Sequence, residues 1–112
     1  MHNKLAVLLL LAAVSGCAHA RRPAALAGWV SDAHCTVAHV GGKNPGCVRK
    51  CIKGGAHVGH PEWTPQSMVL VVDGTNEVVV IDNPESLAGR EAQHVTATGD
   101  VKTGHVRVRS VS

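Results

Sequence analysis

The sequence predicts a mainly β fold: a small five-stranded antiparallel barrel or rolled sheet with one short helix. Two observations lead to this prediction. Aliphatic runs of strand length recur along the second half of the chain and are separated by turn-forming residues. The chain has 112 residues, with Trp29 and Trp63 but no Phe and no Tyr, so its core must be built from aliphatic side chains. A chain of this length forms one small domain with a thin core.

The N-terminus has the pattern of an export signal. Lys4 supplies a positive charge, and Leu5–Val14 is an apolar run that is too short to span a bilayer, which takes about 20 residues. Two cleavage sites fit this pattern. Val14–Cys17 resembles the lipobox of bacterial lipoproteins, whereas Ala18–Ala20 fits an ordinary signal peptidase, which would release a chain starting at Arg21.

We expect lipidation at Cys17, because small residues lead directly into this cysteine after the apolar run. Residues 1–16 would then be a signal peptide, residues 17–25 a tether and residues 26–112 the β-rich domain. Ala18 as the second residue favours the outer membrane, on its periplasmic side, in a Gram-negative cell. Cleavage after Ala20 would instead give a periplasmic or secreted protein. In the lipidated form, the lipid on Cys17 would attach the protein to the membrane.

The first half of the predicted domain holds one strand and the helix. Leu26–Ser31 is a short strand that ends at Asp32, and the glycines and proline of Thr36–Gly46 indicate a loop. Cys47–Lys53 has the pattern of a helix closed by Gly54-Gly55, with basic residues in its last turn. Two helical turns are too short to be stable alone, so packing or the cysteines must hold this helix in place.

The second half of the chain predicts two β-hairpins. After a proline-containing loop over Ala56–Ser67, two apolar runs flank a four-residue turn. A proline-containing break with one helical turn comes next, and two segments in which apolar and polar residues alternate follow it. The four strands are Met68–Val72, Glu77–Ile81, His94–Thr98 and His105–Val111, and the helical turn is Glu85–Gly89. Five short strands with a small helix after the first favour an oligonucleotide/oligosaccharide-binding-like (OB-like) barrel.

Four residues form the most informative pattern for chemistry. Cys35 and His39 are four residues apart, as are Cys47 and Cys51 on the predicted helix, where this spacing places both thiols on one face. Three thiolates and one imidazole form a recurrent structural zinc site, and soft thiolates also suit Cu(I). His34, His57 and His60 are nearby alternatives as ligands.

A disulfide is the competing interpretation, because cysteines usually pair in an oxidising compartment. Cys35 would then bridge Cys47 or Cys51 and leave one thiol free. The bridge would close a loop of about 12 to 17 residues, worth roughly 3 kcal/mol by loop entropy. The sequence favours this disulfide in the cell envelope, with metal binding as the alternative.

The same residues resemble a family of small exported bacterial proteins of unknown function. Those proteins open with Gly-Trp-(Ile/Val)-Ser-Asp, as Gly28–Asp32 does here, and continue with the Cys-x-x-x-His and Cys-x-x-x-Cys pattern and a β-rich, OB-like tail. Similar tail segments are Ile81–Pro84, Leu87–Gly89 and Val95–Gly99. The resemblance covers residues 28–111, except that Thr36 replaces a glycine and His57–Ser67 is an insertion. It implies an exported protein with this Cys/His pattern and no established activity.

Composition narrows the class of function. The net charge of +3 is too balanced for an electrostatic nucleic-acid binder, and few aromatic residues are present to stack bases, so we expect no nucleic-acid partner. No serine is flanked by glycines as in a nucleophile elbow, and no phosphate-binding glycine loop is present. We therefore expect a non-catalytic envelope module that binds a protein or small ligand or has a structural role, with a metal-binding or redox protein as the alternative. Asp32 is expected to be a turn residue, and Trp63 to cover the thin core.

Overall fold

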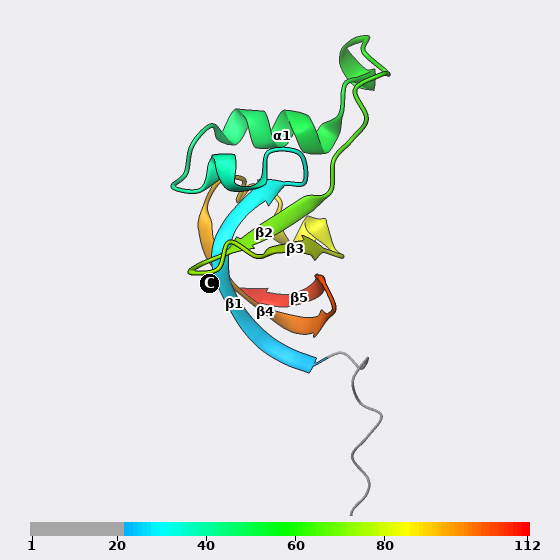
Figure 1. Cartoon of the computed structure of the whole chain (residues 1–112). Coiled ribbons are helices and arrows are strands. Elements are labelled where there is room, and N and C mark those ends of the chain that lie inside the picture. Colours follow the sequence, from blue (N-terminus) through cyan, green and yellow to red (C-terminus); the bar gives the residue numbers. More distant parts are fainter. Residues whose placement is uncertain (1–21) are drawn as a thin grey trace, which may run out of the picture.

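The computed structural model describes residues 22–112, which form a closed five-stranded barrel with the strand order β1-β2-β3-β5-β4 (Figure 1). All neighbouring strands are antiparallel except β3 and β5. The predicted mainly β, OB-like barrel with one short helix is confirmed. Its strands are β1 (Arg22–Asp32), β2 (Met68–Val72), β3 (Val78–Ile81), β4 (His94–Lys102) and β5 (His105–Val111), with one α-helix, α1 (Pro45–Lys53), and 3-10 helices at Thr36–His39, Ala56–Val58 and Pro84–Leu87.

An aliphatic core fills the barrel, as the composition requires. Every strand contributes to it by the alternation of inward and outward residues, and Leu87 of the Pro84–Leu87 turn closes one side. Among the largest side chains that are completely buried, Leu70, Leu87, Val30 and Val95 come from four different elements. The short 3-10 turn before β4 therefore contributes Leu87 to the core, while its residues Pro84 and Glu85 are exposed.

β1 is longer than the sequence predicted and begins at Arg22 rather than at Leu26. Its first residues pair with β4, which is long enough to offer partners as far as Val101. The predicted tether over residues 17–25 is therefore too long at its C-terminal end. At Gly28, where β1 pairs with both β2 and β4, a Cβ atom would overlap the carbonyl of Val71, so a larger residue does not fit.

The barrel closes through a short parallel ladder between β3 and β5, in which two residue pairs are in register. The side chain of Asn83, just after β3, extends this ladder. Its Nδ2 donates to the carbonyl of Val108 at 2.7 Å, and its Oδ1 accepts from the amide of Val108 at 2.8 Å. One amide side chain thus replaces a further backbone pair where the chain turns away from β5.

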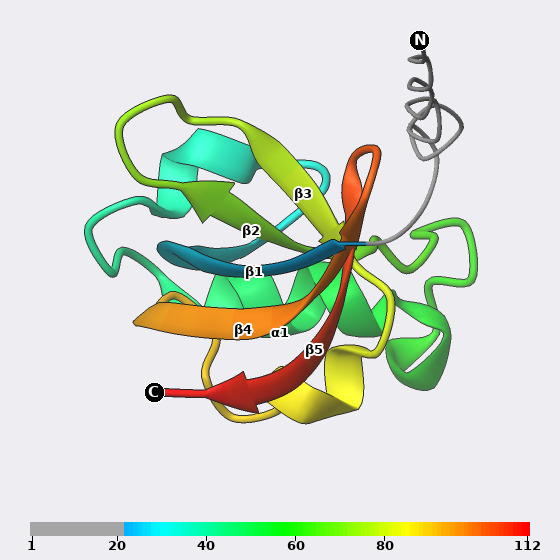
Figure 2. The same cartoon turned by 90° about the horizontal axis from the view of Figure 1, so that it is seen from below.

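A long connection over residues 33–67 joins β1 to β2 and carries α1 across one end of the barrel (Figure 1). Seen from below, the helix lies behind the strands (Figure 2). Val48 of α1 is completely buried, and Ile52 packs against the core. The two ends of the connection, Asp32 and Met68, are cross-strand partners in the β1–β2 ladder.

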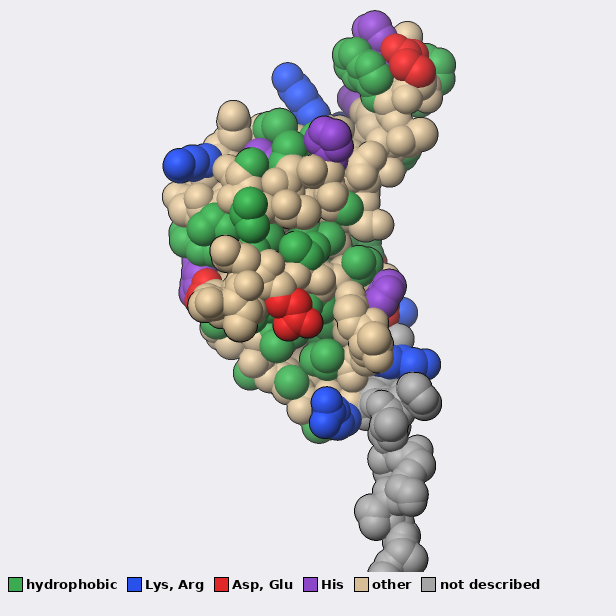
Figure 3. Space-filling model, viewed as in Figure 1, with side chains coloured by type: hydrophobic (Ala, Val, Ile, Leu, Met, Phe, Trp, Pro, Cys, Tyr) green, Lys and Arg blue, Asp and Glu red, His purple; other side chains and the backbone are tan. Residues whose placement is uncertain are grey.

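The segment from Ala56 to Ser67 projects from the barrel beyond the end of α1 (Figure 1). It exposes hydrophobic, acidic and histidine side chains (Figure 3). The prediction that Trp63 covers the core is wrong: 54% of this residue is exposed, and its ring stacks on His60 at 3.8 Å. The core does not need it, because α1 already closes this end of the barrel. None of the helices described in residues 22–112 is long and apolar enough to cross a membrane.

Candidate metal centre

The connection between β1 and β2 gathers three thiols, one imidazole and one carboxylate. Potential ligand atoms of Cys35, His39 and Cys47 lie within 4.8 Å of one another, and so do those of Asp32, Cys35 and Cys51. Cys35 belongs to both groups and links them. In a tetrahedral zinc site the sulfur ligands lie about 3.8 Å apart, since each Zn–S bond is about 2.3 Å long. Within each group of three, the ligand atoms are therefore close to the spacing that one ion requires.

Local geometry explains why these residues meet. Cys35 is the N-cap of the 3-10 turn at Thr36–His39 and His39 is its last residue, and the turn begins three residues after the end of β1. Cys47 and Cys51 lie four residues apart on α1 and so point to one side of the helix, as their spacing predicted. Asn44, at the N-cap of α1, adopts a left-handed conformation, which turns the chain sharply into the helix. The turn and the helix thereby face each other across the end of the barrel.

His39 is held in the orientation of a metal ligand. Its side chain is 4% exposed, and its Nδ1 lies 2.8 Å from the carbonyl of Lys43. A carbonyl can only accept, so Nδ1 carries the proton, and a neutral ring then has its lone pair on Nε2. That atom has no hydrogen-bond partner, although it is buried. Metal-binding histidines commonly donate their second ring nitrogen to a carbonyl in this way.

Asp32 has two roles, of which the sequence predicted one. Its Oδ1 accepts from the backbone amides of His34 at 3.0 Å and Cys35 at 2.9 Å, which is the turn role expected for a residue at the end of a strand. Its Oδ2 lies 3.2 Å from Nε2 of His39, but without hydrogen-bond geometry, and is buried without a partner. Two buried polar atoms thus face each other and the thiols, an arrangement that calls for a cation or a proton between them.

The three described cysteines are free thiols in the structure. Burial raises the pKa of Cys51 to about 12, with further contributions from the charges of Asp32 and Cys47. Burial also raises the pKa of Cys35, as does the charge of Asp32. Without an ion these two groups are neutral thiols at neutral pH, which are poor nucleophiles. A bound cation would have to displace their protons.

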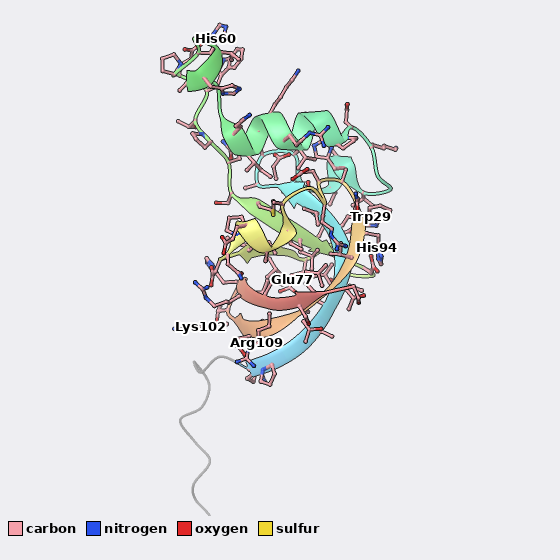
Figure 4. All side chains as sticks on the ribbon, turned by 180° about the vertical axis from the view of Figure 1, so that it is seen from behind. Trp29, His60, Glu77, His94, Lys102 and Arg109 are labelled. Atoms are coloured by element: carbon pink, nitrogen blue, oxygen red, sulfur yellow. The ribbon has the colours of Figure 1, made fainter. Side chains whose placement is uncertain are left out.

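The other candidate histidines lie outside this cluster. His34 and His57 line a cavity next to it, and His60 lies at the tip of the projecting segment, where its Nδ1 is 2.9 Å from Glu62 (Figure 4). The His60–Glu62 pair is exposed on both sides, so it has the character of a surface ion pair rather than of a catalytic acid and base.

Sequence reasoning missed Asp32 as a member of the cluster. The sequence predicted a turn role alone, but the second carboxylate oxygen faces His39, the last residue of the 3-10 turn. A signal was present, because a turn residue three positions before a cysteine cannot be far from the ligands of that turn. The direction of its second oxygen depends on the tertiary packing of α1 and could not be read from the spacing.

Comparison with known protein families, with characterised proteins and with solved structures finds no match for this chain. The resemblance to small exported bacterial proteins thus stays a prediction, and the function has to be argued from the site itself. The predicted disulfide from Cys35 to Cys47 or Cys51 also stays a prediction. The predicted signal peptide, Cys17 and the alternative cleavage site after Ala20 lie outside the described residues.

Proposed function

We propose that this chain is a lipid-anchored protein of the bacterial cell envelope that binds one thiophilic metal ion, Zn(II) or Cu(I), without catalysing a reaction. The ligands are Cys35, His39, Cys47 and Cys51, and Asp32 supplies a negative charge beside them. Anchoring rests on the lipobox-like Val14–Cys17 segment. The metal site rests on the arrangement around His39.

The observation that supports metal binding best is the buried Nε2 atom of His39, which makes no hydrogen bond and faces the buried Oδ2 of Asp32 at 3.2 Å. A histidine that only filled space would bury a lone pair at a cost of about 1–3 kcal/mol. Here the ring is fixed by the Lys43 carbonyl, and a ring nitrogen lies within 4.8 Å of the thiols of Cys35 and Cys47. One cation at that place would satisfy the imidazole, the thiolates and the second oxygen of Asp32 together.

The donor set favours a closed, structural or carrier site. Three sulfur ligands and one nitrogen complete the tetrahedral coordination of zinc and leave no open position for a substrate. The two ligand pairs come from the turn at Thr36–His39 and from α1, so an ion would join them across the end of the barrel. We therefore expect metal binding to stabilise the connection between β1 and β2.

Metal analysis and thiol counting on the same anaerobically purified protein test this proposal. One equivalent of zinc or copper should co-purify, and a chelator should lower the melting temperature. Replacement of the ion by Co(II) should give the visible absorption of a tetrahedral thiolate site. His39→Ala should weaken metal binding without changing the number of thiols. The control variant His105→Ala, which removes an exposed imidazole on β5, should bind the metal as tightly as the parent protein.

The disulfide interpretation makes opposite predictions. One of the three cysteines Cys35, Cys47 and Cys51 would then titrate as a free thiol in the denatured protein, reductant would lower the melting temperature, and chelator would have no effect. That result, in protein purified under the same anaerobic conditions, would refute the proposed metal site. Three free thiols with no affinity for zinc, copper or cobalt would refute it equally.

A further inference from the structure

A cavity of about 580 Å³ lies beside the cluster, between α1 and the projecting segment. Its wall is mainly apolar and includes the ring of Trp63, and its polar side chains include Lys50, His34 and His57. Cavities of this size accommodate small molecules. Cys51 is the residue that belongs both to this cavity and to the thiol cluster.

The cavity walls are fixed to each other by backbone hydrogen bonds. The amide of Gln66 donates to the carbonyl of Cys51 at 2.8 Å, and the amide of Gly55 donates to that of Trp63 at 2.9 Å. Gly55 is buried against Trp63, where a Cβ atom would lie 2.8 Å from the Cβ of that residue. The base of the projecting segment is thus a built wall facing α1 rather than a loose loop.

The charges of the cavity suit an anion. Glu62, the acidic residue of this wall, lies 2.9 Å from Nδ1 of His60 and is 63% exposed, so solvent and salt screen its charge. Lys50 forms no ion pair among residues 22–112. An occupant with a negative charge would therefore find a cation at Lys50, and an apolar body would contact Trp63. A metal ion held in that occupant would lie beside the thiol of Cys51, and the imidazoles of His34 and His57 lie in the same wall.

We propose that this cavity is the exchange site of the metal centre, where a small anionic chelate with an apolar body delivers the ion to Cys51. The step is a ligand exchange without electron transfer. A bond from Sγ of Cys51 to the ion forms as a bond from the chelator to the ion breaks, and the thiol proton leaves with the released chelator. This inference rests on the proposed metal centre, with Cys51 as the first ligand that the ion meets.

The test measures the rate at which the metal-free protein takes Zn(II) from its coloured complex with 4-(2-pyridylazo)resorcinol, a small aromatic, anionic chelator. The rate should saturate as the concentration of the complex rises, because the complex docks before transfer. Lys50→Glu should raise the half-saturating concentration about tenfold, which corresponds to about 1.4 kcal/mol. His57→Ala should slow transfer. Lys102→Glu, which makes the same charge change at a distant strand end (Figure 4), should behave like the parent protein.

Equilibrium zinc stoichiometry, measured on the same variants, separates this inference from the proposed function. One equivalent bound by the parent, Lys50→Glu and His57→Ala proteins, with changed rates in the two variants, would support the exchange site. One equivalent bound by all of them, with rates that rise linearly and do not differ, would overturn the exchange site and leave the metal centre intact. Absence of zinc binding in the parent would refute the exchange site, and absence of copper and cobalt binding as well would refute the metal centre.

Discussion

Asp32→Ala should destabilise the metal-free, reduced protein more than any surface change. Asp32 is completely buried, and its Oδ1 satisfies two backbone amides, those of His34 and Cys35. Truncation removes this acceptor but keeps the two N–H groups at the end of β1. The loss is therefore that of two partly buried hydrogen bonds from a single substitution.

Asp32→Ala should lower the free energy of unfolding by about 2–4 kcal/mol. Each donor left without a partner costs about 1–3 kcal/mol, and we take the lower part of this range because both hydrogen bonds are only partly buried. This is a large fraction of the 5–15 kcal/mol by which a small domain is stable. Asp32→Asn should lower the free energy of unfolding by less than half as much as Asp32→Ala. Its amide oxygen can accept both hydrogen bonds, although the negative charge is removed.

Urea unfolding followed by far-ultraviolet circular dichroism measures these differences, and the slope of each transition should be unchanged. Glu85→Ala is the matched control, because Glu85 is an exposed carboxylate on the 3-10 turn before β4 and should shift stability by less than about 0.5 kcal/mol. If Asp32→Ala unfolds at the same urea concentration as Glu85→Ala, the turn does not depend on this carboxylate and the reasoning is refuted.

Two further outcomes follow from other parts of the chain. Asn83→Ala should lower the free energy of unfolding by about 1–3 kcal/mol, because the amide and carbonyl of Val108 lose their partner. The same urea assay measures this change. A midpoint equal to that of the parent would show that the β3–β5 ladder closes without the Asn83 side chain. Labelled fatty acid should enter the protein in cells and not its Cys17→Ser variant, and release of the same soluble chain starting at Arg21 from both would refute lipidation.

The fold was predictable because its signals are local. The runs at Met68–Val72 and His105–Val111 are strands with the predicted bounds, and the helix at Cys47–Lys53 gains two residues at its start. The extension of β1 to Arg22 was not predictable, because Arg22–Ala25 has no alternation of its own and becomes a strand only by pairing with β4. Long-range partners of this kind leave no local pattern.

The candidate site was predictable to a smaller extent. Spacing predicted Cys47 and Cys51 on one side of a helix and named Cys35 and His39 as further candidate ligands, and the structure places both of these near the helix. Spacing could not show that the imidazole is buried with one nitrogen unpartnered, because that depends on the Lys43 carbonyl and on the way α1 covers the barrel. The different placement of Trp63 has the same origin.

The pairing of Asp32 with Met68 has a consequence for how this chain tolerates change. These residues are neighbours in the β1–β2 ladder, so the barrel itself holds the two ends of the connection together. Loop-closure entropy grows only slowly with length, and each doubling of the loop costs about 0.6 kcal/mol. Residues can therefore be added to or removed from the parts of this connection outside α1, whose Val48 and Ile52 pack inward, at little expense to the strands. Variation in length is expected to accumulate here, where it reshapes the surroundings of the thiols and leaves the hydrophobic core unchanged.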